Sequence, residues 1–74
     1  MLIIKKIEKV QQQFLFKTRC ISNILYIGQI QYDQLEDYFK KEYNIGIPFL
    51  NPRQYLNFDQ IIAVCRIDYL AVGI

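Results

Sequence analysis

The chain has 74 residues, with nine Lys or Arg against seven Asp or Glu, a formal net charge of +2. This length indicates one domain, residues 1–74, and this charge balance excludes a dedicated polycation or an acidic mimic of nucleic acid. Hydrophobic residues make up 53% and aromatic residues 15%, which excludes a disordered chain. A small domain buries only about 60% of the surface that its unfolded chain exposes. We therefore expect some of the apolar surplus to be covered by another chain.

Side chains that support catalysis are scarce. The sequence has no His, one Ser, one Thr and two Cys, which removes the commonest general base, the commonest metal ligand and most nucleophiles. Cys20 and Cys65 lack a metal-ligand spacing, and the three glycines form no phosphate-binding loop. We expect a protein that is not an enzyme, with no catalytic residue, no metal and no cofactor. We also expect a reducing, cytoplasmic compartment in which both cysteines act as small hydrophobes.

No segment is apolar enough to cross a membrane, because the longest apolar run, Ile61–Cys65, is far below the roughly 20 residues required. Residues with AT-rich codons are abundant, which is typical of an AT-rich genome such as that of some bacteria, plasmids or viruses.

The first segment is predicted to be a helix over residues 3–16. A period of 3.6 residues brings four apolar side chains to one side, namely Ile3, Ile7, Val10 and Phe14. The polar side chains of Lys5, Glu8, Lys9 and Gln12 fall on the opposite side. A strand that begins at Leu2 is the alternative.

The middle of the chain indicates a strand followed by a helix. Alternation predicts a strand over 24–32, with Gly28 as a bulge or a site of close backbone approach. Asp33 then stands where an N-cap is expected, and Glu36 completes a capping box for a helix over 34–43. Asn44 is suited to end this helix in the left-handed conformation.

The last third is expected to contain a short helical turn and a strand. Pro48 and Pro52 exclude a long helix, whereas Asn51 and Pro52 can begin a helical turn that runs to Tyr55. Residues 60–72 read as a single strand with Arg66 and Asp68 on one face. If this strand pairs directly and in parallel with 24–32, the crossover between them should be right-handed. A third strand, from the N-terminus or from residues 54–58, is needed for stability.

These elements predict a small single-domain α+β fold, with a short mixed β-sheet covered by one or two amphipathic helices. Two regions carry candidate partner-binding residues. One is the proline-fixed segment with apolar anchors, and the other is the C-terminal strand, which has no charged residue after Asp68 to protect its edge. The candidate residues are Phe49, Leu50, Arg53, Tyr55, Phe58, Leu70 and Val72.

The leading functional hypothesis is therefore a small non-enzymatic protein-binding or regulatory protein that occupies a partner surface. It is either a subunit of an assembly or an inhibitor carried by a mobile element or virus. The partner is another protein, or the chain itself in a homodimer or larger complex.

The alternative hypothesis is nucleic-acid binding through a basic N-terminal segment. Its candidate phosphate-binding residues are Lys5, Lys6, Lys9, Lys17 and Arg19, with Phe14, Phe16 or Tyr26 available to stack on bases. The same pattern suits an anionic membrane surface, and it is also typical of a solvated helix face opposite a core.

Overall fold

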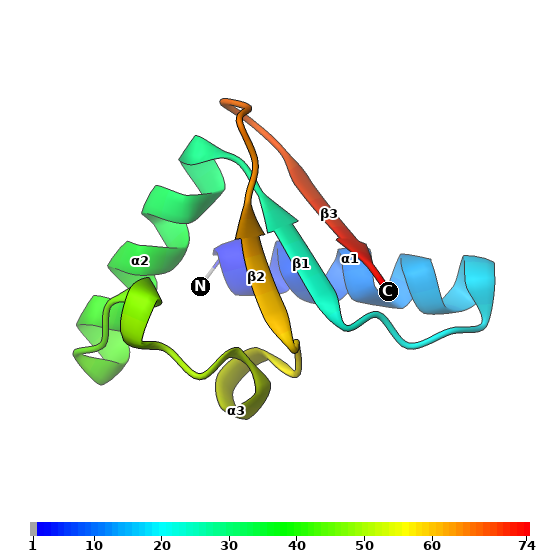
Figure 1. The fold of residues 1–74 in the computed structure, drawn as a ribbon, viewed down its shortest axis with the longest axis horizontal. Coiled ribbons are helices and arrows are strands. Elements are labelled where there is room, and N and C mark those ends of the chain that lie inside the picture. The colour runs from blue at the N-terminus through cyan, green and yellow to red at the C-terminus, as the bar shows by residue number, and fades with distance from the viewer. Residues whose placement is uncertain (1) are drawn as a thin grey trace.

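The computed structural model describes residues 2–74. The elements in chain order are α1 (Leu2–Thr18), β1 (Ile24–Ile27), α2 (Gln29–Tyr43), the 3-10 turn η1 (Ile47–Phe49), α3 (Pro52–Leu56), β2 (Gln60–Ala63) and β3 (Leu70–Gly73). The three strands form one sheet in the order β2-β1-β3, in which β1 runs parallel to β2 and antiparallel to β3. Figure 1 shows α1 crossing behind this sheet. The predicted α+β fold with a short, helix-covered mixed sheet is confirmed.

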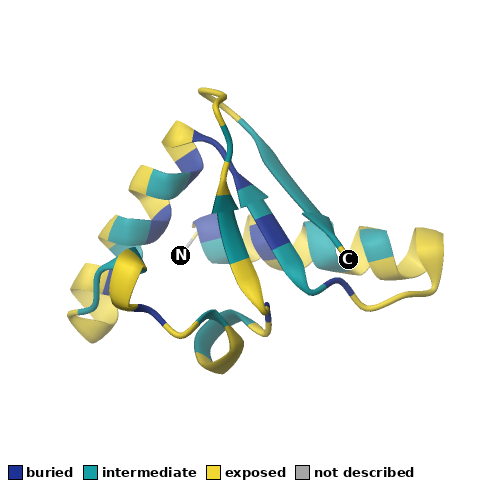
Figure 2. Cartoon of the chain, viewed as in Figure 1, coloured by how far each residue is buried: buried dark blue, intermediate teal, exposed yellow. Residues whose placement is uncertain are grey.

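The core lies between one face of the sheet and the helices. Leu25 and Ile27 of the central strand are wholly buried there, against residues from α1, from α2 and from the chain on either side of α3. The buried core is completed by Ile3, Ile7, Leu35, Phe39, Leu50 and Phe58. Residues on the other sheet face, including Ile24 and Tyr26, are only half-buried, as the teal strands of Figure 2 show.

The helix predicted over 3–16 is confirmed as α1, which excludes the alternative strand at Leu2. Ile3 and Ile7 face the core, as the helical period predicts, whereas Phe14 is half-buried. The helix ends at Thr18 and is followed by Arg19, whose backbone takes the left-handed conformation with φ 62° and whose N–H donates to the Leu15 carbonyl at 2.8 Å.

The strand predicted over 24–32 is too long, and the predicted N-cap at Asp33 is wrong. β1 ends at Ile27 and α2 begins at Gln29, so Asp33 lies within the helix. The cause is tertiary: the N–H groups of Gln29 and Ile30 donate to carbonyl oxygens of the loop between β2 and β3, each at 2.9 Å. These carbonyls satisfy donors that a helix N-terminus otherwise leaves free. The remaining prediction, a helix over 34–43, is confirmed within α2.

Gly28, the N-cap residue of α2, is a site of close backbone approach and not a bulge. A Cβ atom on Gly28 would lie 2.7 Å from the Arg66 carbonyl oxygen and 2.9 Å from the Tyr69 nitrogen. The Gly28 N–H donates to the Tyr69 carbonyl at 2.9 Å. Only a residue without a side chain therefore lets the loop between β2 and β3 reach the start of α2.

The single strand predicted over 60–72 is wrong, because the segment forms β2 and β3 with a loop over 64–69. Arg66 and Asp68 lie in this loop and share no strand face. The buried Gln31 holds the loop: its Oε1 accepts from the Tyr69 N–H at 2.9 Å, and its Nε2 donates to the Asp68 carboxylate. The third strand therefore comes from the C-terminal segment itself, and not from the N-terminus or residues 54–58.

Local signals in the segment from 44 to 57 are confirmed. Asn44 ends α2 in the left-handed conformation, with φ 56°. The Asn51 side chain caps α3 by accepting from the N–H groups of Arg53 and Gln54, and Pro52 opens that helix. The short helical turn predicted here therefore forms for the reason expected.

The aromatic residues of α2 and α3 pack edge to face. The Phe39 ring lies 5.7 Å from the ring of Tyr55 and 5.1 Å from that of Tyr38, measured between centroids. Burial, together with the neighbouring Tyr43, raises the pKa of the Tyr38 phenol above its ordinary value. This cluster joins α3 to the buried side of α2.

Candidate functional site

The outer edge of β3 has backbone groups that no strand of the described chain pairs. The Gly28 N–H donates to the Tyr69 carbonyl, and β1 pairs with β3 with Tyr26 opposite Ala71. Because antiparallel strands turn alternate residues toward each other, Ala71 faces β1, and the N–H and C=O groups of Leu70 and Val72 point to the free side. Their side chains stand opposite Ile27 and Leu25 and pack on the core. Leu70 and Val72 thus hold the edge in place while their backbone groups remain available.

Helix α1 extends past this edge. In Figure 1 its C-terminal half continues beyond β3, under the position that a fourth strand would occupy. A groove of about 280 Å³ lies between the helix and the strand, and we call it the β3 groove. It is lined by Val10, Gln13, Phe14 and Lys17 of α1 and by Leu70, Ala71 and Val72 of β3. The helix therefore provides an apolar floor with one cation beside an unpaired strand edge.

Charge is distributed unevenly over the molecule. Helix α1 carries four Lys and one Glu, whereas α2 carries four acidic residues and two Lys. Lys17, in the β3 groove, is exposed and forms no ion pair with any residue from 2 to 74. The electrostatic potential at the groove therefore favours an anionic ligand.

The structure separates the partner-binding residues that the sequence predicts. Leu70 and Val72 lie at the β3 groove, whereas Leu50 and Phe58 are buried in the core. Phe49 is 87% exposed and Tyr55 is half-buried against α2. Phe49 belongs to η1, which contacts α2, and Tyr55 belongs to α3, which contacts β2. Strand β2 lies on the other side of β1 from β3. The two candidate regions do not form one continuous surface.

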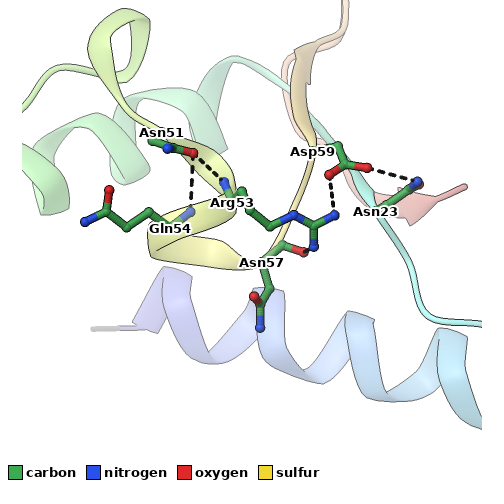
Figure 3. A network of polar contacts seen from close by, with 6 residues as sticks. All are labelled: Asn23, Asn51, Arg53, Gln54, Asn57 and Asp59. Carbon is green, nitrogen blue, oxygen red and sulfur yellow. Dashed lines mark hydrogen bonds and ion pairs between the residues drawn. The ribbon is translucent and has the colours of Figure 1, made fainter.

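Arg53 belongs to a local polar network that Figure 3 shows. Its guanidinium pairs with the Asp59 carboxylate and donates to the Asn57 carbonyl at 3.4 Å, and the other Asp59 oxygen accepts from the Asn23 amide at 3.3 Å. The contacts link α3 to the entries of β1 and β2. Arg53 thus already has partners within the chain that explain its position.

The five basic residues of the alternative hypothesis are all exposed but do not share one face. Lys5 and Lys9 lie on the side of α1 opposite its buried residues, Lys17 lines the β3 groove, and Arg19 follows the helix. Lys6 also lies on α1 and is exposed. The basic segment therefore presents charge in several directions.

Both cysteines are free and exposed, so neither packs in the core as the small hydrophobe that the sequence led us to expect. Within residues 2–74, no group of three or more His, Cys, Asp or Glu is placed to hold a metal ion. No helix over the same residues has the length and apolar character needed to cross a bilayer. Comparison with protein-family models, curated proteins and solved structures finds no match to this chain.

The sequence-based reasoning assigned Val10 and Phe14 to the core and did not identify the groove that they line. The signal that could have found it is the length of the predicted helix. At 1.5 Å per residue, the predicted helix of 14 residues is about 21 Å long, whereas three strands spaced about 4.8 Å apart are narrower than that. One end of such a helix must project past a sheet that it crosses.

Proposed function

We propose that this protein is a non-enzymatic binding module, and that it takes up an extended segment of another protein as a fourth strand on the outer edge of β3. The observation that carries this proposal is the free edge at Leu70 and Val72 with the projecting half of α1 beneath it. Strand addition to a sheet edge obtains affinity from main-chain hydrogen bonds and specificity from pockets for alternate side chains.

The β3 groove favours a segment that presents apolar residues and one acidic residue at the alternate positions that face α1. A bound strand turns every second side chain toward α1, because the side-chain period of a strand is two. The floor there offers Val10 and Phe14 for apolar contact and Lys17 for a carboxylate. An acidic segment also suits the excess of lysine along α1.

Charge disfavours a second copy of this chain as the occupant. Two β3 edges paired about a twofold axis place both α1 helices on the same face of the joined sheet. Each α1 carries four Lys and one Glu, so the two helices would repel each other. The homodimer expected from the sequence is thus the competing occupant of the same edge, and oligomeric state distinguishes the two.

The test is an NMR titration of the protein with a short synthetic peptide in which every second residue is, in turn, valine, valine and glutamate, so that one face of the bound strand carries both residue types. We expect shifts of the Leu70 and Val72 amides, and weaker binding by Lys17→Glu of up to about fivefold, since an exposed charge pair contributes about 1 kcal/mol or less. Lys9→Glu makes the same charge change on the outward face of α1 and should alter binding less. Equal effects of the two variants, or no shift at Leu70 and Val72, would contradict the proposal.

A backbone variant tests the strand addition itself. Val72→Pro removes an N–H that points away from β1, and proline is accepted on an edge strand where its N–H side faces solvent. We expect this variant to fold and to lose affinity for the peptide. Retained affinity in the folded Val72→Pro protein would show that the peptide binds elsewhere. Binding of nucleic acid that competes with the peptide would favour the alternative hypothesis.

A further inference from the structure

The projecting end of α1 carries a second surface, which we call the α1 tip and define as Leu15, Phe16, Lys17, Arg19 and Ile21. The side chain of Phe16 is 83% exposed, that of Ile21 is 80% exposed and that of Leu15 is 47% exposed. Two shallow grooves meet at Leu15, one shared with Phe16 and Arg19 and the other with Ile21. Large apolar side chains are thus concentrated at the point of the molecule farthest from α2 (Figure 1).

Arg19 is an unusual residue for its backbone position. The three helices α1, α2 and α3 are each followed by a residue with positive φ, namely Arg19, Asn44 and Asn57. Asparagine is one of the few side chains that adopts the left-handed conformation readily, and arginine is not. The exposed Arg19 guanidinium therefore stands beside Phe16 on a backbone that would favour glycine or asparagine.

We propose that the α1 tip docks on the surface of an anionic lipid bilayer. Phe16, Ile21 and Leu15 would enter the boundary between headgroups and acyl chains, and Lys17 and Arg19 would meet the lipid phosphates. Apolar side chains combined with basic residues are the features by which an interfacial helix binds such a surface. This mode of binding is peripheral and does not require a helix that spans the membrane.

Two observations favour lipid over nucleic acid at this surface. The aliphatic side chains of Leu15 and Ile21 have no ring to stack on a base, and only Phe16 could do so. The acidic helix α2 lies at the opposite end of the longest axis of the molecule (Figure 1). With the tip against an anionic surface, α2 is held away from it, so the charge distribution favours a single orientation.

Vesicle flotation tests this proposal with the whole protein. We expect the protein to float with vesicles of equal parts phosphatidylglycerol and phosphatidylcholine, and not with vesicles of phosphatidylcholine alone. The double variant Phe16→Ala, Ile21→Ala should lose binding. The matched control is the double variant Phe49→Ala, Ile67→Ala. It removes an aromatic and an aliphatic side chain that are similarly exposed, at 87% and 75%, but lie elsewhere on the molecule. This control should bind the vesicles as the unaltered protein does.

Arg19→Asn tests the electrostatic part without disturbing the backbone, since asparagine suits the positive φ. We expect about fivefold weaker binding to the anionic vesicles, since each basic residue near such a surface contributes about 1 kcal/mol. The proposal is overturned if the tip and control double variants float equally, or if neutral vesicles bind as well as anionic ones. It is also overturned if the tip double variant loses affinity only for single-stranded RNA.

Discussion

The buried side chain of Gln31 accepts a hydrogen bond from the backbone N–H of Tyr69 at 2.9 Å, although 38 positions separate the two residues in the sequence. The contact joins the first turn of α2 to the residue that precedes β3. The same side chain donates to the Asp68 carboxylate. The free edge on which the proposed binding depends is therefore anchored by one polar side chain inside the fold.

Replacing Gln31 by Leu should destabilise the protein by about 1–3 kcal/mol, because the Tyr69 N–H would lose its partner in a part-buried place. Gln34→Leu, on the exposed side of the same helix, is the matched control and should change stability by about 0.5 kcal/mol or less. Urea unfolding followed by circular dichroism measures both. Equal stability of the two variants would show that Gln31 does not hold the loop.

Gly28→Ala should also destabilise the protein by about 1–3 kcal/mol. The new methyl group would overlap backbone atoms of Arg66 and Tyr69, which can move only if the whole loop between β2 and β3 moves. Gly46→Ala provides the comparison. There the Cβ would meet the Glu36 Oε1 at 3.1 Å, at the end of a flexible side chain. We expect a change of about 1 kcal/mol or less at Gly46, and thermal unfolding would reveal the difference as a lower Tm for Gly28→Ala alone.

Asn51, which caps α3, and Asp33, which the sequence wrongly predicts to cap α2, should respond differently to alanine. Asn51→Ala removes the side chain that caps α3 and should cost about 0.5–2 kcal/mol. Asp33→Ala removes only a hydrogen bond from the Gln29 side chain and should cost about 0.5 kcal/mol or less. A larger loss of unfolding free energy for Asp33→Ala than for Asn51→Ala would place the start of α2 nearer to Asp33.

Phe39→Ala should be among the most damaging single changes, at about 3–5 kcal/mol, because Phe39 is only 1% exposed and contacts aromatic residues of α2 and α3. Phe49→Ala deletes the same ring from an exposed position and should leave stability nearly unchanged. Chemical denaturation of the two variants is a direct comparison. A stable Phe39→Ala protein would mean that this side of α2 is not the core.

Hydrophobic periodicity and local capping signals in the sequence were sufficient to predict α1, the second half of α2 and α3. The errors arose where contacts distant in sequence decide the outcome. Gln31 looked like a polar residue on a strand, yet it is buried in α2 because the loop that follows β2 satisfies its amide. The loop over 64–69 could not be predicted, since its Arg66 and Ile67 carbonyls accept hydrogen bonds from the start of α2, a contact distant in the sequence.

The candidate site was predictable only in part. The absence of a charged residue after Asp68 drew attention to Leu70 and Val72, and the structure places both residues on an edge strand. The pattern of the proline segment could not distinguish Phe58, which is buried, from Phe49, which is exposed, because both are apolar residues in irregular backbone. That distinction depends on which side of the segment the sheet approaches.

Amide hydrogen exchange at three consecutive residues of β3 tests the central claim most directly. In the free protein we expect fast exchange at Leu70 and Val72, whose N–H groups point away from β1, and slow exchange at Ala71, which faces β1. Saturation with the valine–glutamate peptide should then slow exchange at Leu70 and Val72 and leave Ala71 unchanged. Unaltered fast exchange at Leu70 and Val72 in the peptide-saturated protein would contradict strand addition at this edge.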